Sequence, residues 1–257
     1  MKGLPLLLVL RAGTSFAQSP FDGTWIIDSD STTVSEKPVV YLVAKGMIRC
    51  LGCTGNVKIK ADGDDQKIPK GSYWDTASAR IVDANTVEII CKKAGKPMYT
   101  ETDTVSPDGN TLTQLVKDTT EAEAVTIETL SRRVEKGPAG AHAVSGSWRA
   151  YKVKRSKNGS IIKYKCTADG FSAETPLGEK FDAKFDGKFY PVEDDPGHTM
   201  VSLKLINANT VEQTGQREGK VISIMTLTVA PDRKTIHAVW QSKEDNTRNA
   251  FDMRKQP

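Results

Sequence analysis

Cysteines are the residues with the most evident chemistry in this chain of 257 residues, which has four of them. Cys50 and Cys53 form a C-x-x-C pair, Cys91 lies in the same half of the chain, and Cys166 lies in the other half. A C-x-x-C can be a redox pair, half of a metal site or a small disulfide. No helix of a βαβ unit follows it, so we expect a disulfide, joining Cys53 to Cys91 or Cys50 to Cys53. The third cysteine of this half would be left over and could pair with Cys166; the spacing does not fix the pairing.

Other groups that could do chemistry are scattered. The three histidines, His142, His198 and His237, are far apart in the sequence, so we expect no three-histidine zinc site. The acidic runs at 62–65 and 193–195 could offer oxygen atoms to calcium, but they do not fit the twelve-residue calcium loop and are typical of turns. There is no Gly-x-Ser-x-Gly elbow, P-loop or H-E-x-x-H. We therefore expect no catalytic constellation, no metal and no cofactor.

One stretch of the sequence occurs twice. Residues 81–113 and 205–237 align without a gap, with 13 of 33 positions identical at an offset of 124 residues. Gly-x-Trp also recurs, at 23–25 and at 146–148. In each copy the glycine suits a sharp bend and the tryptophan can plug one end of a barrel. An internal duplication of this kind predicts two units of the same fold.

Both units have the pattern of antiparallel β-structure. Short segments with period-two alternation are separated by turn signals, for example at 107–110 and 231–234. About eight strands are expected in each unit, and a meander of that size hides its edge strands by closing into a barrel. We predict an all-β protein of two tandem antiparallel up-and-down barrels, the first at 18–134 and the second at 145–257, joined by a linker at 135–144.

The first residues are typical of an export signal. Lys2 supplies a positive charge, residues 4–10 form a short apolar core, and residues 15–17 give a small-x-small cleavage site. The core is short and Arg11 ends it, so a disordered or buried terminus of a cytosolic protein is the alternative. We expect a signal peptide at 1–17 and a periplasmic or secreted protein. No run reaches the ~18–20 apolar residues of a spanning helix, so no membrane span is expected.

Charge differs between the units. Residues 18–134 have 14 Lys and Arg against 17 Asp and Glu, whereas residues 145–257 have 19 against 14. The basic excess gathers at 149–165, in Arg149, Lys152, Lys154, Arg155, Lys157, Lys163 and Lys165. It could contact an anionic envelope surface or the acidic first unit, although a solvated strand surface is the simpler interpretation. No aromatic interleaving accompanies it, so no nucleic-acid partner is expected.

Several segments of the second unit carry a family resemblance. They are Phe-Asp-Gly-Lys-Phe-Tyr-Pro-Val at 185–192, Met-Val-Ser-Leu-Lys-Leu-Ile at 200–206, Asn-Thr-Val-Glu at 209–212 and Ala-Pro-Asp-Arg-Lys-Thr-Ile at 230–236. Over nearly all of 145–255 the chain resembles the lipocalin-like (calycin-like) barrel domains of largely uncharacterised secreted bacterial proteins. The first unit keeps the resemblance at 81–113. The resemblance implies a lipocalin-like fold and a periplasmic or secreted setting, and it brings no catalytic residue.

The function expected from these observations is ligand binding. A small barrel is either filled by side chains or holds one small ligand, and the sequence leaves both open. Our hypothesis is an exported lipocalin-like protein that binds a small apolar or amphipathic ligand, using aromatic, histidine and arginine side chains: Trp148, Tyr164, Tyr190, His198, Arg217, His237 and Trp240.

Two alternatives remain open at this point. One is a calycin-type enzyme (isomerase, hydratase or lyase) with one buried acid or base, for which His237, Glu212 and Tyr164 are the first candidates. The other is an envelope-associated structural protein that uses the basic residues at 149–165.

Overall fold

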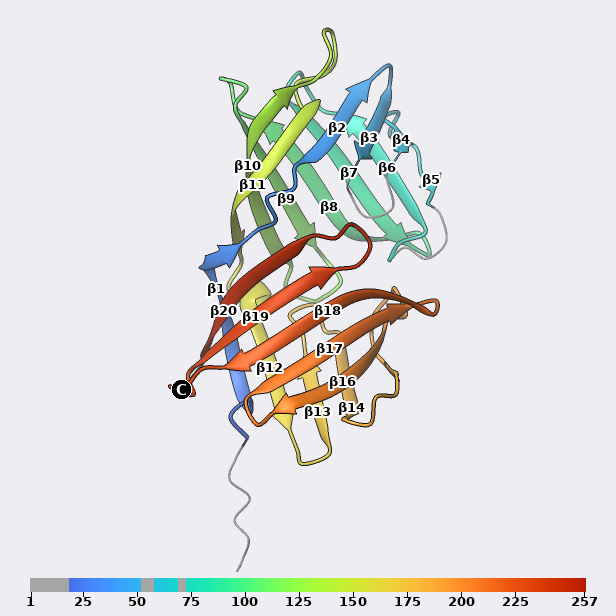
Figure 1. Cartoon of the computed structure of the whole chain (residues 1–257). Helices are drawn as coiled ribbons and strands as arrows, with labels where there is room; N and C mark the ends of the chain where they lie inside the picture. The colour runs from blue at the N-terminus through green and yellow to red at the C-terminus, as the bar shows by residue number, and fades with distance from the viewer. Residues whose placement is uncertain (1–18, 52–57, 69–72) are drawn as a thin grey trace, which may run out of the picture.

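The computed structural model describes residues 19–51, 58–68 and 73–257. This part of the chain is all-β, apart from one short 3-10 helix, η1 (Asn158–Ser160). Its strands form two antiparallel sheets of ten strands each, and each sheet is nearly closed into a barrel (Figure 1). The predicted all-β fold of two antiparallel barrels is confirmed, with ten described strands in each sheet instead of about eight. The expected signal peptide and Cys53 lie outside the described residues.

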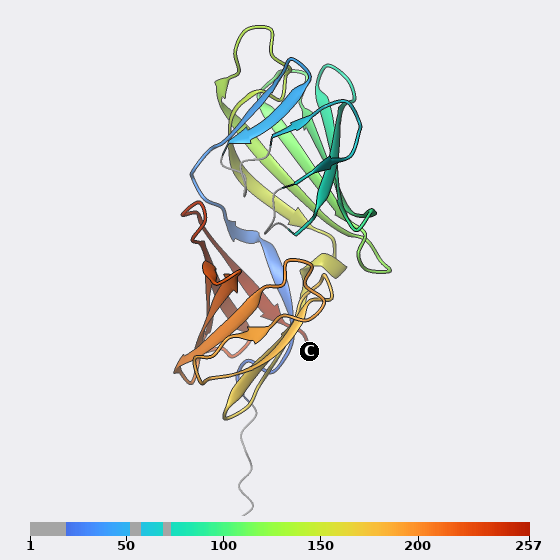
Figure 2. The same ribbon diagram turned by 90° about the vertical axis from the view of Figure 1, so that its right-hand side faces the viewer.

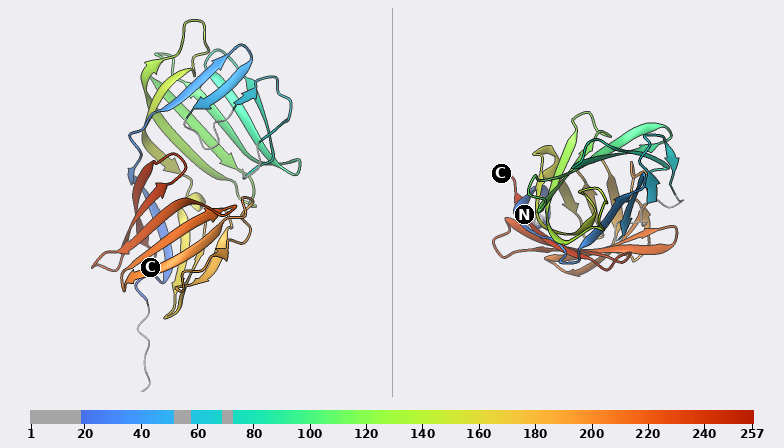
Figure 3. Two further views of the ribbon diagram at one scale, coloured as in Figure 1. Left: turned by 45° about the vertical axis from the view of Figure 1, so that its right-hand side comes forward. Right: turned by 90° about the horizontal axis from the view of Figure 1, so that it is seen from above.

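The first sheet, which we call barrel 1, comes from one continuous stretch of chain, 39–155. Its strand order is β4-β3-β2-β11-β10-β9-β8-β7-β6-β5. In the view from above, these strands run around a ring (Figure 3). The strands are β2 (Val39–Ala44), β3 (Met47–Leu51), β4 (Lys58–Lys60), β5 (Gln66–Lys67), β6 (Thr76–Ile81), β7 (Thr86–Lys93), β8 (Lys96–Val105), β9 (Thr111–Asp118), β10 (Val125–Lys136) and β11 (Gly146–Arg155).

The second sheet, barrel 2, combines one strand from the beginning of the chain with nine from its second half. Its order is β14-β13-β12-β1-β20-β19-β18-β17-β16-β15. The strands are β1 (Gly23–Thr33), β12 (Ile161–Cys166), β13 (Gly170–Glu174), β14 (Lys180–Lys184), β15 (Tyr190–Pro191), β16 (Met200–Asn207), β17 (Thr210–Arg217), β18 (Lys220–Val229), β19 (Thr235–Ser242) and β20 (Arg248–Lys255).

This strand pairing divides the chain differently from the units expected at 18–134 and 145–257. Strand β1 pairs with β12 and β20, whereas β11 pairs with β2 and β10. Barrel 1 is therefore inserted between the first two strands of barrel 2, and the chain passes between the barrels at 34–38 and again at 156–160 (Figure 2). Residues 135–144, the expected linker, connect β10 to β11 within barrel 1.

Each Gly-x-Trp closes one barrel. Gly23 and Gly146 have φ values of 127° and 135°, which side chains rarely adopt. The tryptophans that follow, Trp25 and Trp148, are 0% and 1% exposed. Each indole Nε1–H donates to the carbonyl of the residue four positions earlier, at 2.7 Å for Trp25 and 2.8 Å for Trp148. The two copies of the motif thus form the same plug, one in each barrel.

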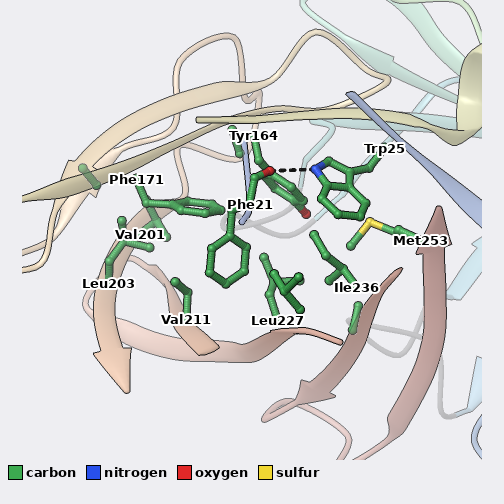
Figure 4. Packing of buried hydrophobic residues seen from close by; sticks show 14 of the residues in the cluster. Phe21, Trp25, Tyr164, Phe171, Val201, Leu203, Val211, Leu227, Ile236 and Met253 are labelled. Carbon is green, nitrogen blue, oxygen red and sulfur yellow. Dashed lines mark hydrogen bonds between the residues drawn. The ribbon is translucent and has the colours of Figure 1, made fainter. Parts of the chain in front are cut away.

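Barrel 2 is filled with apolar side chains over much of its interior. Alternate residues of its strands point inward, and they pack against residues that precede β1 (Figure 4). Seven large members of this core are at most 1% exposed: Phe21, Trp25, Phe171, Leu203, Leu227, Ile236 and Met253. Burial on this scale stabilises each such side chain by roughly 1.5–3 kcal/mol.

Candidate functional site

The open ends of the two barrels face each other. Strand β1 begins at the end of barrel 2 that is distant from barrel 1, and β11 begins at the end of barrel 1 that is distant from barrel 2 (Figure 1). The tryptophan plugs near the start of each strand therefore lie at the two outer ends. The loops at the opposite ends meet between the barrels.

A cavity of ≈ 500 Å³ lies at this meeting point, and we call it the inter-barrel cleft. Barrel 1 contributes aromatic, apolar and acidic side chains from β8 and the loops beside it, and barrel 2 contributes the β13–β14 turn and the loop after β15. The lining residues are Tyr73, Trp74, Met98, Tyr99, Asp118, Thr120 and Glu121 of barrel 1, and Leu177, Glu179, Asp194 and Pro196 of barrel 2.

Three aromatic rings of barrel 1 form one wall of the cleft. Tyr73 and Trp74 are stacked, with ring centroids 6.5 Å apart. Trp74 meets Tyr99 edge to face, at 5.3 Å between centroids. Stacked and edge-to-face contacts are the preferred geometries of aromatic pairs. All three aromatic residues also line the cavity, so a molecule that enters it meets an aromatic wall.

Tyr73 also contacts barrel 2. The guanidinium carbon of Arg217 lies 4.2 Å from the centroid of the Tyr73 ring. Arg217 is 8% exposed, and its Nη2 donates to Thr199 Oγ1 at 3.2 Å. In the loop that contains Thr199, the Asp195 carboxylate accepts two backbone N–H bonds, from Gly197 at 2.8 Å and Thr199 at 2.6 Å. The loop at 195–199 is thus fixed by its own hydrogen bonds and holds Arg217 against the tyrosine.

Glu179 is the acidic group of the cleft with the most altered acidity. Burial raises the pKa of its carboxyl to about 7, and the charges of Asp195 and Asp118 act in the same direction. A hydrogen bond from Thr175 and the charge of Arg217 oppose the rise in pKa. The carboxyl of Glu179 therefore changes its charge near neutral pH, at a position where it lines the cavity.

A second cavity, of ≈ 170 Å³, occupies the open end of barrel 2. Trp240 and Gln213 line it, and so do Tyr73 and Glu179, which line the inter-barrel cleft as well. Tyr73 and Glu179 therefore stand between the two spaces. The Nε2 of Gln213 is buried and has no hydrogen-bond partner within the described part of the chain, so it is a donor available to a group that enters the smaller cavity.

The interior of barrel 1 contains a buried acid pair. Glu101 and Asp103 alternate with threonines along β8, and Gln114 Nε2 donates to Tyr41 Oη at 2.8 Å and to Glu101 at 3.2 Å. Asp103 is 1% exposed, and its carboxylate oxygens have no hydrogen-bond partner of normal geometry among the described residues. Burial raises the pKa of both carboxyls, and repulsion from Glu101 adds to the rise for Asp103. The two carboxyls therefore bind protons more tightly than they would in water, and their titrations are coupled.

The structure brings two of the seven expected ligand residues to this region. Arg217 holds Tyr73, and Trp240 lines the smaller cavity. Tyr164 instead packs in the core of barrel 2, with its ring centroid 5.1 Å from that of Phe171. Trp148 belongs to barrel 1, where it is the plug.

The other three expected ligand residues lie away from the cavities: Tyr190 is partly buried against the core of barrel 2, and the two histidines are exposed. Tyr190 donates from its hydroxyl to Asp186 at 3.0 Å, and His198 is exposed, with φ of 52°. His237 is exposed and lies 3.0 Å from Asp252. Glu212, the further acid–base candidate, is half-buried on β17. None of these four side chains lines either of the two cavities described above.

The cysteines correct part of the expectation. Cys50 is disulfide-bonded, whereas Cys91 and Cys166 are free thiols. The alternatives that pair Cys53 with Cys91, or a left-over cysteine with Cys166, are therefore wrong. Cys91 faces Tyr99 across β7 and β8 inside barrel 1, and burial raises the pKa of its thiol to about 11. Cys91 lies on β7 of barrel 1 and Cys166 on β12 of barrel 2, which explains why these two thiols do not meet.

The basic stretch at 149–165 is divided between the barrels. Its first residues lie on β11 in barrel 1 and its last on β12 in barrel 2. Three of its lysines pair with acids: Lys152 with Asp30 at 3.4 Å, Lys154 with Glu128 at 2.6 Å, and Lys163 with Glu174 at 2.8 Å. These pairs reduce the positive charge that the stretch can offer to an anionic surface.

The sequence interpretation missed most of the cleft. Tyr73, Trp74 and Glu179 lie outside the aligned repeats, in segments with turn composition. The acid pair carried a signal, because Tyr99, Glu101, Asp103 and Val105 alternate with three threonines. That pattern shows two faces but does not show which one points inward.

Comparisons with known proteins add little. No family model matches the chain, and no curated protein matches it. Among solved structures, a double mutant of the vaccine antigen Transferrin Binding Protein B (TbpB) from Haemophilus parasuis Hp5 is similar at 8% sequence identity, over 94% of this chain and 78% of that chain, with a TM-score of 0.17. Such a low score supports no conclusion about this protein. In the described part of the chain, no helix has the length and apolarity that crossing a bilayer requires.

Proposed function

We propose that this protein binds a small amphipathic ligand in the inter-barrel cleft, as a lipocalin-like binding protein. The observation that carries the proposal is the ≈ 500 Å³ cavity with three aromatic rings and several polar groups around it. Ligand sites are typically concave spaces of roughly 300–1,000 Å³ with aromatic walls and a few polar groups that orient the ligand. The cleft has each of these properties.

The position between the barrels is favoured over the centre of barrel 2. The interior of barrel 2 is occupied by its own apolar side chains (Figure 4), and the space that remains there, ≈ 170 Å³, is small for an amphipathic molecule. The smaller cavity suits the apolar end of a ligand whose body lies in the cleft. Tyr73 and Glu179 would then contact the ligand at the junction.

We also propose that the protein is periplasmic or secreted. The export-type pattern at 1–17 supports this proposal, and so does the disulfide at Cys50, because structural disulfides are favoured in oxidising compartments. A fusion of residues 1–30 to a reporter that is active only outside the cytoplasm tests it. Reporter activity that depends on residues 1–17 is expected; equal activity without them would contradict export.

Binding can be tested with N-phenyl-1-naphthylamine, a neutral amphipathic fluorophore. Saturable binding with one site per chain is expected, together with energy transfer from Trp74. Trp74→Ala should weaken binding because it removes the central ring of the wall. Tyr151→Ala is the matched control, since Tyr151 is an aromatic residue of the same barrel that is 43% exposed on β11.

Two outcomes would contradict the proposal. One is the absence of saturable binding for the naphthylamine and for a panel of neutral amphipathic compounds. The other is binding that Trp240→Leu abolishes and Trp74→Ala leaves unchanged, because that result would place the ligand in barrel 2 alone.

A further inference from the structure

We propose that the ligand of the inter-barrel cleft is an organic cation, namely an amine or quaternary ammonium compound with an apolar or aromatic body. This inference rests on the proposed function, because it names the chemical class of the molecule that occupies the same cleft. Three observations carry it: the shape of the cavity, the aromatic wall and the signs of the surrounding charges.

The aromatic wall suits a cation. The Tyr73, Trp74 and Tyr99 rings surround one side of the space, with the Trp74 ring between the other two. Ring faces attract a cation placed within about 6 Å of the centroid, and tryptophan does so most strongly. Part of this capacity is already used within the protein, because Arg217 lies 4.2 Å from the Tyr73 ring. That contact shows the Tyr73 ring accepting a cation on one face, and Trp74 and Tyr99 are also among the residues that line the cavity.

The charged side chains that line the cavity are acidic in the described part of the chain. Four carboxyl groups line it and no lysine, arginine or histidine is among the lining residues that the structure describes. The carboxyls belong to Asp118, Glu121, Glu179 and Asp194. A concave space with this lining lowers the energy of a bound cation and raises that of an anion.

Neighbouring basic groups reduce this excess without cancelling it. Lys180 forms an ion pair with Asp194 at 3.3 Å, so the charge of one of the four carboxyls is already neutralised. Arg217 lies 4.2 Å from the centroid of the Tyr73 ring and is not itself a lining residue, although its charge acts on Glu179. The Asp118 carboxylate accepts hydrogen bonds from two neutral donors, the N–H and the hydroxyl of Thr120, at 2.8 and 2.5 Å. Asp118, Glu121 and Glu179 thus remain to balance a bound cation.

Both barrels supply these groups, so the ligand also joins the barrels. The end of the Glu121 side chain of barrel 1 lies against Gly178 of barrel 2, and a larger residue at 178 would displace it. Gly178 has φ of 79°, so the turn itself requires glycine. This contact holds a barrel 1 carboxylate beside Glu179 at the edge of the cleft.

The test compares probes that differ in charge but not in shape. Benzyltrimethylammonium is a quaternary cation, and neopentylbenzene is its neutral carbon isostere; benzenesulfonate is an anionic aromatic compound. Calorimetric or NMR titration of the full chain at pH 8 should show the cation binding at least about fivefold more tightly than the isostere, with the anion weakest.

Two variants test the source of the preference. Trp74→Leu keeps an apolar wall and should reduce cation binding more than isostere binding. Asp118→Asn combined with Glu121→Gln should reduce the cation preference, whereas Glu123→Gln, in the same loop but outside the lining, should not. Circular dichroism and thermal unfolding of each variant establish that it is folded before the titration.

The outcomes separate this inference from the proposed function. Equal affinity for the cation and its isostere, or no cation binding by a protein that binds N-phenyl-1-naphthylamine, overturns the inference and leaves the proposed function standing. If neither the cation nor the naphthylamine binds, both fail. The inference would also be overturned if both the double carboxylate variant and Trp74→Leu kept the full preference for the cation, because the cation would then bind elsewhere.

Discussion

Arg217 of barrel 2 stacks on the ring of Tyr73 of barrel 1, with 4.2 Å between the guanidinium carbon and the ring centroid. The pair joins the two barrels beside the cleft and lies where both cavities meet. A buried arginine on a tyrosine face contributes through cation–π attraction and through packing of its apolar stem.

The Tyr73–Arg217 contact should be measurable by a double-mutant cycle. We expect Tyr73→Leu and Arg217→Met to show a coupling free energy of about 0.5–2 kcal/mol in urea unfolding. The exposed pair Arg132 and Tyr151, which lie 4.8 Å apart on barrel 1, is the matched control and should couple more weakly. Coupling no larger than that of the control pair would show that Tyr73 and Arg217 do not interact across the barrels.

The inserted arrangement of the barrels predicts which fragments fold. Residues 34–157 contain every described strand of barrel 1, including β11, and should fold alone with a cooperative thermal transition. Residues 18–134 lack β11, so β2 and β10 would each lose a partner, and we expect this fragment to aggregate or remain unfolded. Circular dichroism and size-exclusion chromatography check both. If the 18–134 fragment folded stably and the 34–157 fragment did not, the result would contradict the strand pairing.

The buried Asp103 predicts a pH dependence of stability. Its pKa is raised in the folded protein, so the folded state holds a proton that the unfolded chain releases above pH ~3.9. Stability therefore falls as pH rises from about that value toward the raised pKa. Asp103→Asn cannot ionise, so its stability relative to the parent should increase between pH 4.5 and 7.5, as measured by urea unfolding.

Asp83 provides a control of opposite sign. Its carboxylate accepts the N–H of Asn85 at 2.8 Å, and this bond lowers its pKa. Asp83 therefore contributes stability that is present above pH ~3.9 and is lost as pH falls through the lowered value. Asp83→Asn should remove stability at pH 7.5 and change little at pH 2.5. If the change in the free energy of unfolding followed pH in the same way for both variants, the burial of Asp103 would be refuted.

The two free thiols should differ in reactivity. Cys91 is 2% exposed inside barrel 1, and its thiol pKa is raised to about 11. Cys166 is partly exposed, although burial raises its pKa as well. Because the thiolate is the reactive form and needs access, Cys166 should react with iodoacetamide at least roughly tenfold faster. In Cys166→Ser, labelling should become limited by unfolding; rapid labelling of that variant would show that Cys91 is accessible.

The repeats in the sequence predict the strands well, for a physical reason. Alternation and turn residues are local properties, so the later strands of both barrels agree closely with the segments expected from the duplication at 81–113 and 205–237. Which neighbour a strand selects is not local. Strands β1 and β11 begin with the same motif, and nothing in Gly-x-Trp distinguishes the barrel that each one completes.

The cleft could not be predicted in the same way, because it depends on differences between the repeats. At the offset of 124 residues, Tyr73 corresponds to Gly197, and Arg217 corresponds to Lys93. The stacked pair therefore arises where the copies have diverged. Glu101 and Asp103 were missed for another reason: charged residues that alternate with threonine ordinarily mark a solvent-facing side of a strand, and here that side faces the interior of barrel 1.

The two chain crossings at 34–38 and 156–160 limit how the barrels can move. A single crossing would let one barrel swivel and bend in any direction. Two crossings, together with the ion pair between Lys152 and Asp30 and the bond from Lys37 Nζ to the Asp245 carbonyl at 2.7 Å, hold one side of the junction together. We therefore expect the barrels to move mainly by a hinge motion about β1 and β11. Opening of the cleft by this motion would break the Tyr73–Arg217 contact.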